Sequence, residues 1–173
     1  MFRLPTLVAL VAMTTSLAAQ SVIKESVPGI VNFSKVDTIA CAGATTPAAL
    51  AEVKKQGYVS VLNLRMANEA GADIDAATAA AKALGLTYIH LPMNSAAPDP
   101  AVVDTFLKVV TDAKNQPVFI HCASANRASA LWMVKRMVVD KWDAEKAGTE
   151  AAALGLTNPA LKAFALEQAA KRK

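Results

Sequence analysis

The feature that most constrains this fold is the stretch at residues 117–132, which reads PVFIHCASANRASALW. Residues 118–120 form a short β-branched and aromatic run after a proline, a pattern that predicts a buried strand. Small residues follow, and from Arg127 apolar residues recur at helical spacing, so we expect a helix to begin near Asn126. A strand, a tight loop and a helix N-terminus in this order predict an anion site. The N–H groups of the loop and of the first helical turn point at one place, and the helix dipole favours negative charge there.

Two side chains at this turn suit chemistry on a phosphate. Cys122 stands at the mouth of the loop, where the same N–H donors would stabilise a thiolate. Arg127 offers a planar fork of donors that fits a bound phosphate or sulfate. The simpler alternative is a buried structural cysteine with a surface arginine, but small residues beside a cysteine at a strand-to-helix turn favour a ligand site.

Strands and helices alternate along the rest of the chain. Strand patterns lie at residues 36–41, 59–64, 87–91 and 118–120. Alternation with helices predicts an α/β fold, with a mainly parallel central sheet of about four to five strands and helices on both faces. Ligands of such sheets bind at the carboxyl ends of the strands. Cys41, Arg65, Pro92 and Cys122 each lie at or just past such an end, so four separate stretches converge on one edge.

The chain divides into four segments. Residues 1–19 are typical of a secretory signal peptide, with Arg3 followed by an apolar run too short to span a membrane and then by small residues. We expect cleavage after Ala18 or Ala19, a periplasmic or secreted protein, and no stable membrane insertion after cleavage. A retained N-terminal helix or membrane anchor is the alternative. Residues 20–35 are interpreted as a lead-in segment, 36–157 as the α/β domain, and 158–173 as a C-terminal helix.

Composition narrows the choice of ligand. The 173 residues carry a net charge of +4, which favours anionic ligands. No Lys/Arg cluster is interleaved with aromatic residues, so nucleic acid is not indicated. His121, Cys122 and Cys41 do not have the spacing of metal ligands, and we expect no metal or cofactor. Two cysteines allow one Cys41–Cys122 bridge or two thiols. The oligomeric state is not predicted.

The run His-Cys, small residues and Arg at 121–127 resembles the phosphate-binding loop of cysteine-dependent tyrosine and dual-specificity phosphatases. That superfamily spaces its pair as Cys-x5-Arg, whereas Cys122 and Arg127 are spaced as Cys-x4-Arg. The bacterial beta-lactamase-hydrolase-like phosphatase-like family has the shorter loop. It also has counterparts to Ala42-Gly43 and to residues 61–65 followed by Glu69. The chain resembles this family more, from about residue 36 to 156, which implies a phosphatase-like three-layer sandwich.

The resemblance assigns roles to the residues of the loop. Cys122 is the implied nucleophile, forming a phosphocysteine, and Arg127 holds the phosphoryl oxygens. His121 supports the loop from behind, while Arg65 and Glu69 form an ion pair that shapes the rim of the site. The implied substrate-binding residues are Ala123, Ser124, Ala125, Asn126 and Ser129.

The general acid is the least defined role. The superfamily carries an aspartate on the loop after the third strand, and the corresponding loop at residues 93–99 offers only Asp99. Asp99 is therefore the candidate acid. However, Asp99-Pro100 is also a helix-capping pattern, and that pattern favours capping as the interpretation.

Three functions fit these observations. The first is a phosphatase that acts on a phosphorylated protein, such as one carrying phosphotyrosine, or on a small phosphomonoester. The second is a rhodanese-like sulfurtransferase, whose active loop is also Cys-x4-Arg or close to it, although Asn63 stands where that class has an aspartate. The third is a non-catalytic module that binds a phosphorylated or sulfated partner. His121 before Cys122 favours the phosphatase.

Overall fold

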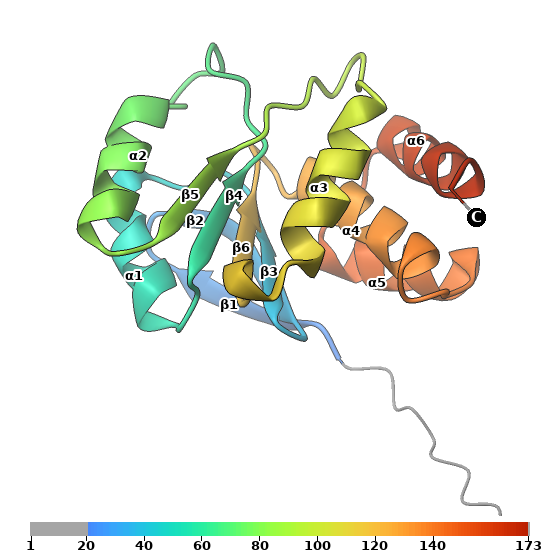
Figure 1. The fold of residues 1–173 in the computed structure, drawn as a ribbon, viewed down its shortest axis with the longest axis horizontal. Helices are drawn as coiled ribbons and strands as arrows, with labels where there is room; N and C mark the ends of the chain where they lie inside the picture. Colours follow the sequence, from blue (N-terminus) through green and yellow to red (C-terminus); the bar gives the residue numbers. More distant parts are fainter. Residues whose placement is uncertain (1–20, 173) are drawn as a thin grey trace, which may run out of the picture.

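A six-stranded sheet forms the centre of the computed structural model, which describes residues 21–172 (Figure 1). The strands are β1 (Ile23–Val27), β2 (Ile30–Val36), β3 (Ile39–Ala42), β4 (Ser60–Asn63), β5 (Thr87–His90) and β6 (Val118–His121). The helices are α1 (Leu50–Lys55), α2 (Ile74–Ala83), α3 (Ala101–Thr111), α4 (Asn126–Val138), α5 (Ala144–Leu154) and α6 (Pro159–Ala170), with short 3-10 turns η1 (Pro47–Ala49) and η2 (Ala113–Asn115). The predicted signal peptide at residues 1–19 lies outside the described residues.

The strand order places β6 in the middle of the parallel part of the sheet. The order is β1-β2-β3-β6-β4-β5, with β3, β6, β4 and β5 parallel and the β1–β2–β3 connections antiparallel. The predicted α/β class and mainly parallel sheet are confirmed. Because β6 lies between two parallel neighbours, the loop that follows it opens at the centre of the carboxyl edge, where such sheets bind ligands.

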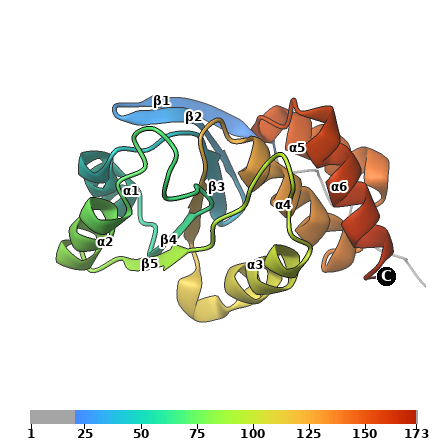
Figure 2. The ribbon, with the colours of Figure 1, turned by 90° about the horizontal axis from the view of Figure 1, so that it is seen from above.

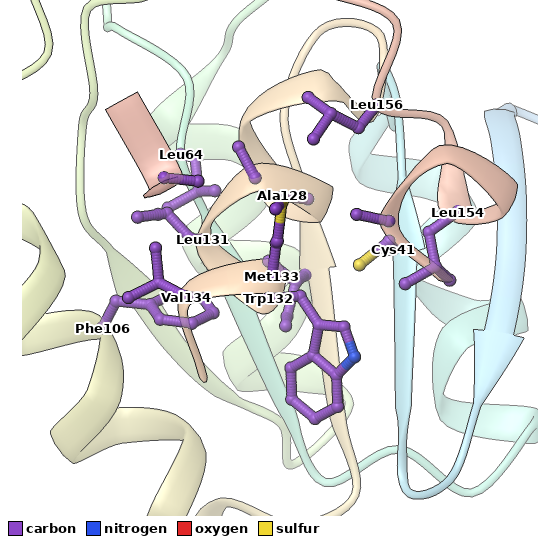
Figure 3. Close-up of a cluster of buried hydrophobic side chains, with 14 of the residues drawn as sticks. Cys41, Leu64, Phe106, Ala128, Leu131, Trp132, Met133, Val134, Leu154 and Leu156 are labelled. Carbon is purple, nitrogen blue, oxygen red and sulfur yellow. The ribbon is translucent and has the colours of Figure 1, made fainter. Parts of the chain in front are cut away.

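The central strands send alternate side chains into two separate cores, as the two-residue period of a strand requires. Ile39 and Ile120 lie in the larger core, which α3, α4, α5 and α6 cover, and Figure 3 shows part of it. Ala40 and Phe119 lie in the smaller core beneath α1 and α2. The small side chains of β3 and the buried aliphatic residues of β6 and β4 thus define a sheet that is covered on both faces.

The segment at residues 20–35, interpreted from the sequence as a lead-in, instead forms β1 and most of β2. These two strands bring the sheet to six, above the four to five that the sequence predicts. The pattern is weak because β1 is the edge strand: its first four residues, Ile23 to Ser26, are exposed and partly charged. An edge strand does not need the apolar alternation of a buried one.

The C-terminal helix predicted at residues 158–173 is α6, which begins at Pro159 and packs against α4 as part of the larger core. Asn158 caps it by accepting hydrogen bonds from the N–H groups of Ala160 and Leu161. Between residues 21 and 172, no helix has the length and apolar character needed to cross a membrane.

Candidate active site

The loop between β6 and α4, residues 122–125, is called the cysteine loop below. Its chain reverses at Ala125, which has a left-handed backbone with φ of 74° immediately before α4 begins at Asn126. The N–H of Cys122 still donates to the carbonyl of Ala42 at 3.1 Å, as a continuation of the β3–β6 pairing. The predicted strand, loop and helix start therefore fall where the sequence places them. Figure 2, the view from above, shows α4 on the opposite side of the sheet from α1 and α2.

Cys122 and Arg127 are both buried, with 1% and 4% of their surfaces exposed. The pKa of Arg127 is raised above its ordinary value: burial opposes the rise, while the Glu69 carboxylate and the nearby Cys122 side chain cause it. The side chains of Cys122 and Arg127 are therefore close enough to interact.

Arg127 is fixed on one side only. Its Nη1 donates to the carbonyls of Leu64 at 3.0 Å and Met93 at 2.8 Å, and to Glu69 Oε1 at 2.5 Å. Its Nη2 donates to Glu69 Oε2 at 2.8 Å. These bonds engage the end of the guanidinium. They leave the edge made by Nε and the second Nη2 hydrogen for an anion, because a guanidinium carries five donors in a rigid plane.

Glu69 binds two arginines at once. Besides Arg127, it accepts a hydrogen bond from Arg65 Nε at 3.3 Å and from the N–H of Met66 at 2.8 Å. Burial opposes ionisation of this carboxyl, but the bonds from Arg127 and Met66 outweigh burial and lower the pKa of Glu69 to about 2. The Arg65–Glu69 pair implied by the resemblance is present, and the sequence did not reveal that Glu69 also anchors Arg127.

Arg65 holds the loop that carries Glu69. Its Nη1 donates to the carbonyl of Gly71 at 3.0 Å, and its Nη2 donates to the carbonyl of Ala70 at 2.5 Å. Since Arg65 is buried, with 5% of its surface exposed, these bonds fix the turn after β4 rather than a surface contact. Arg65 acts on the site through Glu69.

His121 lies behind the cysteine loop. Its ring stacks on Phe119, with the ring centroids 5.6 Å apart and the planes at 22°. Burial, and then the charge of Arg65, lower the pKa of His121 to about 3, so the ring is neutral near pH 7. Its Nδ1 has no hydrogen-bond partner within residues 21–172. This placement is compatible with the supporting role that the resemblance implies.

The predicted substrate-binding residues are not equally placed. Ala123 and Ser124 are exposed at the tip of the loop, whereas Ala125 is buried. Ser129 is fully buried in α4, and its hydroxyl donates to the carbonyl of Ala125 at 3.0 Å. The structure therefore places Ser129 beneath the loop rather than in contact with a ligand. The side chain of Asn126 is committed to other residues, described below.

Asp99 is exposed on the loop before α3, and its Oδ1 accepts a hydrogen bond from the N–H of Ala101 at 2.9 Å. That bond satisfies a donor in the first turn of α3, so capping is what the geometry shows. The role of Asp99 as general acid stays a prediction.

Cys41 and Cys122 are both free thiols. Cys41 is opposite Ile120 in the β3–β6 register and lies in the larger core near Leu154 (Figure 3). Burial, and then the proximity of Cys122, raise the pKa of the Cys41 thiol. Because Cys122 is two residues past Ile120, ordinary strand spacings put the two α-carbons about 8 Å apart, beyond the roughly 7 Å that a disulfide spans. Cys41 therefore packs as a small apolar residue. Among the described residues, no group of three or more potential ligands is arranged to hold a metal ion.

Residues 33–139 match the family described as beta-lactamase hydrolase-like protein, phosphatase-like domain. The chain belongs to this family. The match covers β2 to α4, and therefore the cysteine loop, Arg65 and Glu69. A search of curated protein sequences gave no significant match.

Solved structures of phosphatases share the fold. A putative phosphatase from Shewanella putrefaciens is 21% identical, with a TM-score of 0.67 over 83% of this chain and 95% of its own. TpbA of P. aeruginosa is 19% identical, with a TM-score of 0.65 over 88% and 92%. The catalytic core of the S. cerevisiae PP-IP phosphatase Siw14 is 18% identical, with a TM-score of 0.69 over 82% and 87%. At these identities the likeness establishes the fold.

Proposed function

We propose that this protein is an exported cysteine-dependent phosphatase that hydrolyses phosphomonoesters through a phosphocysteine intermediate. The observation that carries the proposal is the pairing of Cys122 with the open edge of Arg127. One end of the guanidinium is fixed by Glu69 and two carbonyls, which leaves its remaining donors for an anion, and the Cys122 side chain lies close enough to raise the pKa of Arg127. Membership of a phosphatase-like family supports the same function.

The reaction follows from these positions. The Cys122 thiolate attacks phosphorus, so that an S–P bond forms while the P–O bond to the leaving group breaks, and the leaving oxygen takes up a proton from solvent, which the attacking water of the second step returns. Water then attacks phosphorus, the S–P bond breaks, and the thiolate returns as inorganic phosphate leaves. The open edge of Arg127 and the N–H groups of residues 123–127 stabilise the negative charge on the phosphoryl oxygens.

The buried ionic groups prepare this site before a ligand arrives. Glu69 stays ionised because its pKa is lowered to about 2, so Arg127 keeps its bidentate partner at any pH where the protein is used. Such preorganisation avoids the cost of reorienting the arginine during the reaction.

The substrate class is a phosphorylated protein side chain or a small phosphomonoester. A crystal structure of a cysteine-to-serine variant of TpbA is a complex with pTyr; that protein is 17% identical, with a TM-score of 0.57 over 91% of this chain and 90% of its own. Phosphotyrosine is therefore the first natural compound to assay.

The decisive experiment compares two reactions of the same preparation. Wild type should hydrolyse p-nitrophenyl phosphate, be inhibited by orthovanadate, and lose turnover completely when Cys122 is replaced by Ser. It should not transfer sulfur from thiosulfate to cyanide. Sulfur transfer without phosphate hydrolysis would establish the sulfurtransferase instead, and phosphate binding without turnover would establish a binding module.

Export is proposed from residues 1–19 alone, on their signal-peptide pattern. The test is expression of the full chain in a bacterium, followed by fractionation and N-terminal sequencing. We expect a periplasmic protein that starts at Ala19 or Gln20. A protein that keeps Met1 and stays in the cytoplasm or the membrane fraction would contradict export.

A further inference from the structure

The side chain of Asn126 joins the cysteine loop to the turn between α5 and α6. Its Oδ1 accepts hydrogen bonds from the N–H groups of Thr157 at 2.7 Å and Asn158 at 2.8 Å. Its Nδ2 donates to the hydroxyls of Ser124 at 3.2 Å and Thr157 at 3.3 Å. Asn126 lies between the cysteine loop and Arg127, so the hydrogen bonds of its side chain fix the start of α4 in front of that arginine.

The same turn packs closely against the loop at Gly155. This residue ends α5 in a left-handed conformation with φ of 116°. A β-carbon at Gly155 would lie 3.1 Å from the β-carbon of Ala125. The α5–α6 turn and the cysteine loop therefore approach as closely as backbone allows.

Strand β2 and the residues just past β3 hold the other side of the loop. The carbonyl of Ala123 accepts from the N–H of Ala44 at 2.9 Å, and the carbonyl of Ser124 accepts from Asn32 Nδ2 at 3.3 Å. Asn32 has a left-handed backbone with φ of 50°, a conformation that Asn tolerates better than most residues. Two successive carbonyls of the loop are thus held by donors from outside the loop.

We infer that Asn126 and Asn32 are positioning residues, which set the affinity of the cysteine loop for phosphate by anchoring it to the α5–α6 turn and to β2. The inference rests on the proposed function, because it assigns how the same site is held. Neither side chain needs to contact the substrate. Displacement of a loop by a fraction of an ångström is enough to cost a large factor in turnover.

The first test compares Asn126→Ala with Asp143→Ala. Asp143 caps α5 through the N–H of Lys146 at 2.7 Å and contacts neither anchor, so its loss lowers stability by removing a cap only. Assayed well below both unfolding midpoints, Asn126→Ala should lower kcat/KM on p-nitrophenyl phosphate by about 10-fold or more and weaken inhibition by inorganic phosphate by a similar factor. Asp143→Ala should leave both within about twofold of wild type.

A second pair of variants tests the α5–α6 turn itself. This pair still tests the inference if Asn126→Ala does not fold. Gly155→Ala forces its new methyl against Ala125, whereas Gly57→Ala also strains a left-handed backbone, at φ of 89°, but meets nothing within 4 Å. Only Gly155→Ala should weaken inorganic phosphate binding. Asn32→Gly keeps the left-handed backbone and removes one hydrogen bond, so it should lower kcat/KM by about 3- to 5-fold.

The outcomes separate this inference from the proposed function. Binding of inorganic phosphate is also read from the rise in unfolding midpoint that it causes, which needs no turnover. If wild type binds and hydrolyses phosphate compounds while Asn126→Ala and Gly155→Ala match their controls, the positioning role is wrong and the phosphatase stands. If wild type neither hydrolyses nor binds phosphate, both fail together.

Discussion

Glu69 and Arg127, which are 58 residues apart in the sequence, meet through two parallel hydrogen bonds of 2.5 and 2.8 Å. The carboxylate comes from the turn after β4 and the guanidinium from the first turn of α4. This bidentate pair engages the end of the guanidinium and leaves the edge made by Nε and the second Nη2 hydrogen available to another acceptor. The orientation of Arg127 therefore depends on a residue that lies outside the cysteine loop.

Replacing Glu69 with Gln should destabilise the protein and reduce turnover. A neutral amide leaves the buried Arg65 and Arg127 without their shared counter-charge, and breaking a buried pair costs about 3–5 kcal/mol. Because 24% of the Glu69 side chain is exposed, we expect the free energy of unfolding to fall by about 2–3 kcal/mol, at or below the lower end of that range. Urea unfolding measures this loss. Glu52→Gln, whose partner Lys55 is 3.6 Å away on the surface, is the control and should change little.

The contribution of Glu69 to stability should fade in acid. The pKa of Glu69 is lowered from 4.5 to about 2 in the folded protein, so the folded state favours the ionised carboxyl. This stabilisation is fully present above about pH 4.5 and is lost as the pH falls through about 2. The difference in unfolding free energy between wild type and Glu69→Gln should therefore shrink between about pH 5 and about pH 2. A constant difference across that range would show that the charge of Glu69 does not contribute to stability.

Replacing Arg127 with Lys should abolish most turnover while the fold survives. A lysine ammonium can reach one partner, but it cannot bind Glu69 and a phosphate in a single plane. We expect a loss in kcat/KM of at least about 100-fold. Arg136→Lys is a matched control on the same helix: Arg136 is also buried, but it binds Glu150 and Asp140, so its loss should affect stability and leave kcat unchanged. Equal activity of Arg127→Lys and wild type would show that Arg127 does not bind the substrate.

The local parts of this site were predictable, because a strand, a loop and a helix start that follow one another are encoded by consecutive residues. Cys122 and Arg127 fall where periodicity puts them. The Glu69–Arg127 and Asn126–Thr157 contacts join segments far apart in the chain, and no local pattern marks them. Ser129 was assigned from family spacing, but two residues along a helix turn a side chain by about 200°, which carries its hydroxyl away from the side of Arg127 and into the core.

Replacing Gly43 with Ala should damage the site by forcing the β2–β3 hairpin and the cysteine loop apart. A β-carbon there would lie 3.0 Å from the carbonyl oxygens of Ala123 and Val31, which are backbone atoms that cannot rotate away. The hairpin would have to move off the cysteine loop, and we expect a loss in kcat/KM of about 10-fold or more. Gly148→Ala, within α5, is the control: its new methyl meets only the side chains of Met133 and Lys162, at 3.6 Å or more, so stability should hold or rise.

Replacing Asp99 with Asn should be nearly silent. The Oδ1 of Asp99 accepts from the N–H of Ala101 at 2.9 Å, and Asn makes the same bond about as well as Asp. We expect an unchanged unfolding midpoint and a kcat/KM within about twofold of wild type on both an aryl and an alkyl phosphate. Asp112→Asn, which alters a similar bond to the N–H of Lys114 at 3.1 Å, is the control.

The alkyl phosphate is the more sensitive substrate for detecting a general acid, because its alkoxide leaves poorly and depends on a proton donor. A loss on the order of 10²-fold confined to turnover of the alkyl phosphate would make Asp99 the general acid. The capping bond would then describe only the resting position of that side chain, and the loop before α3 would have to carry it toward the leaving oxygen.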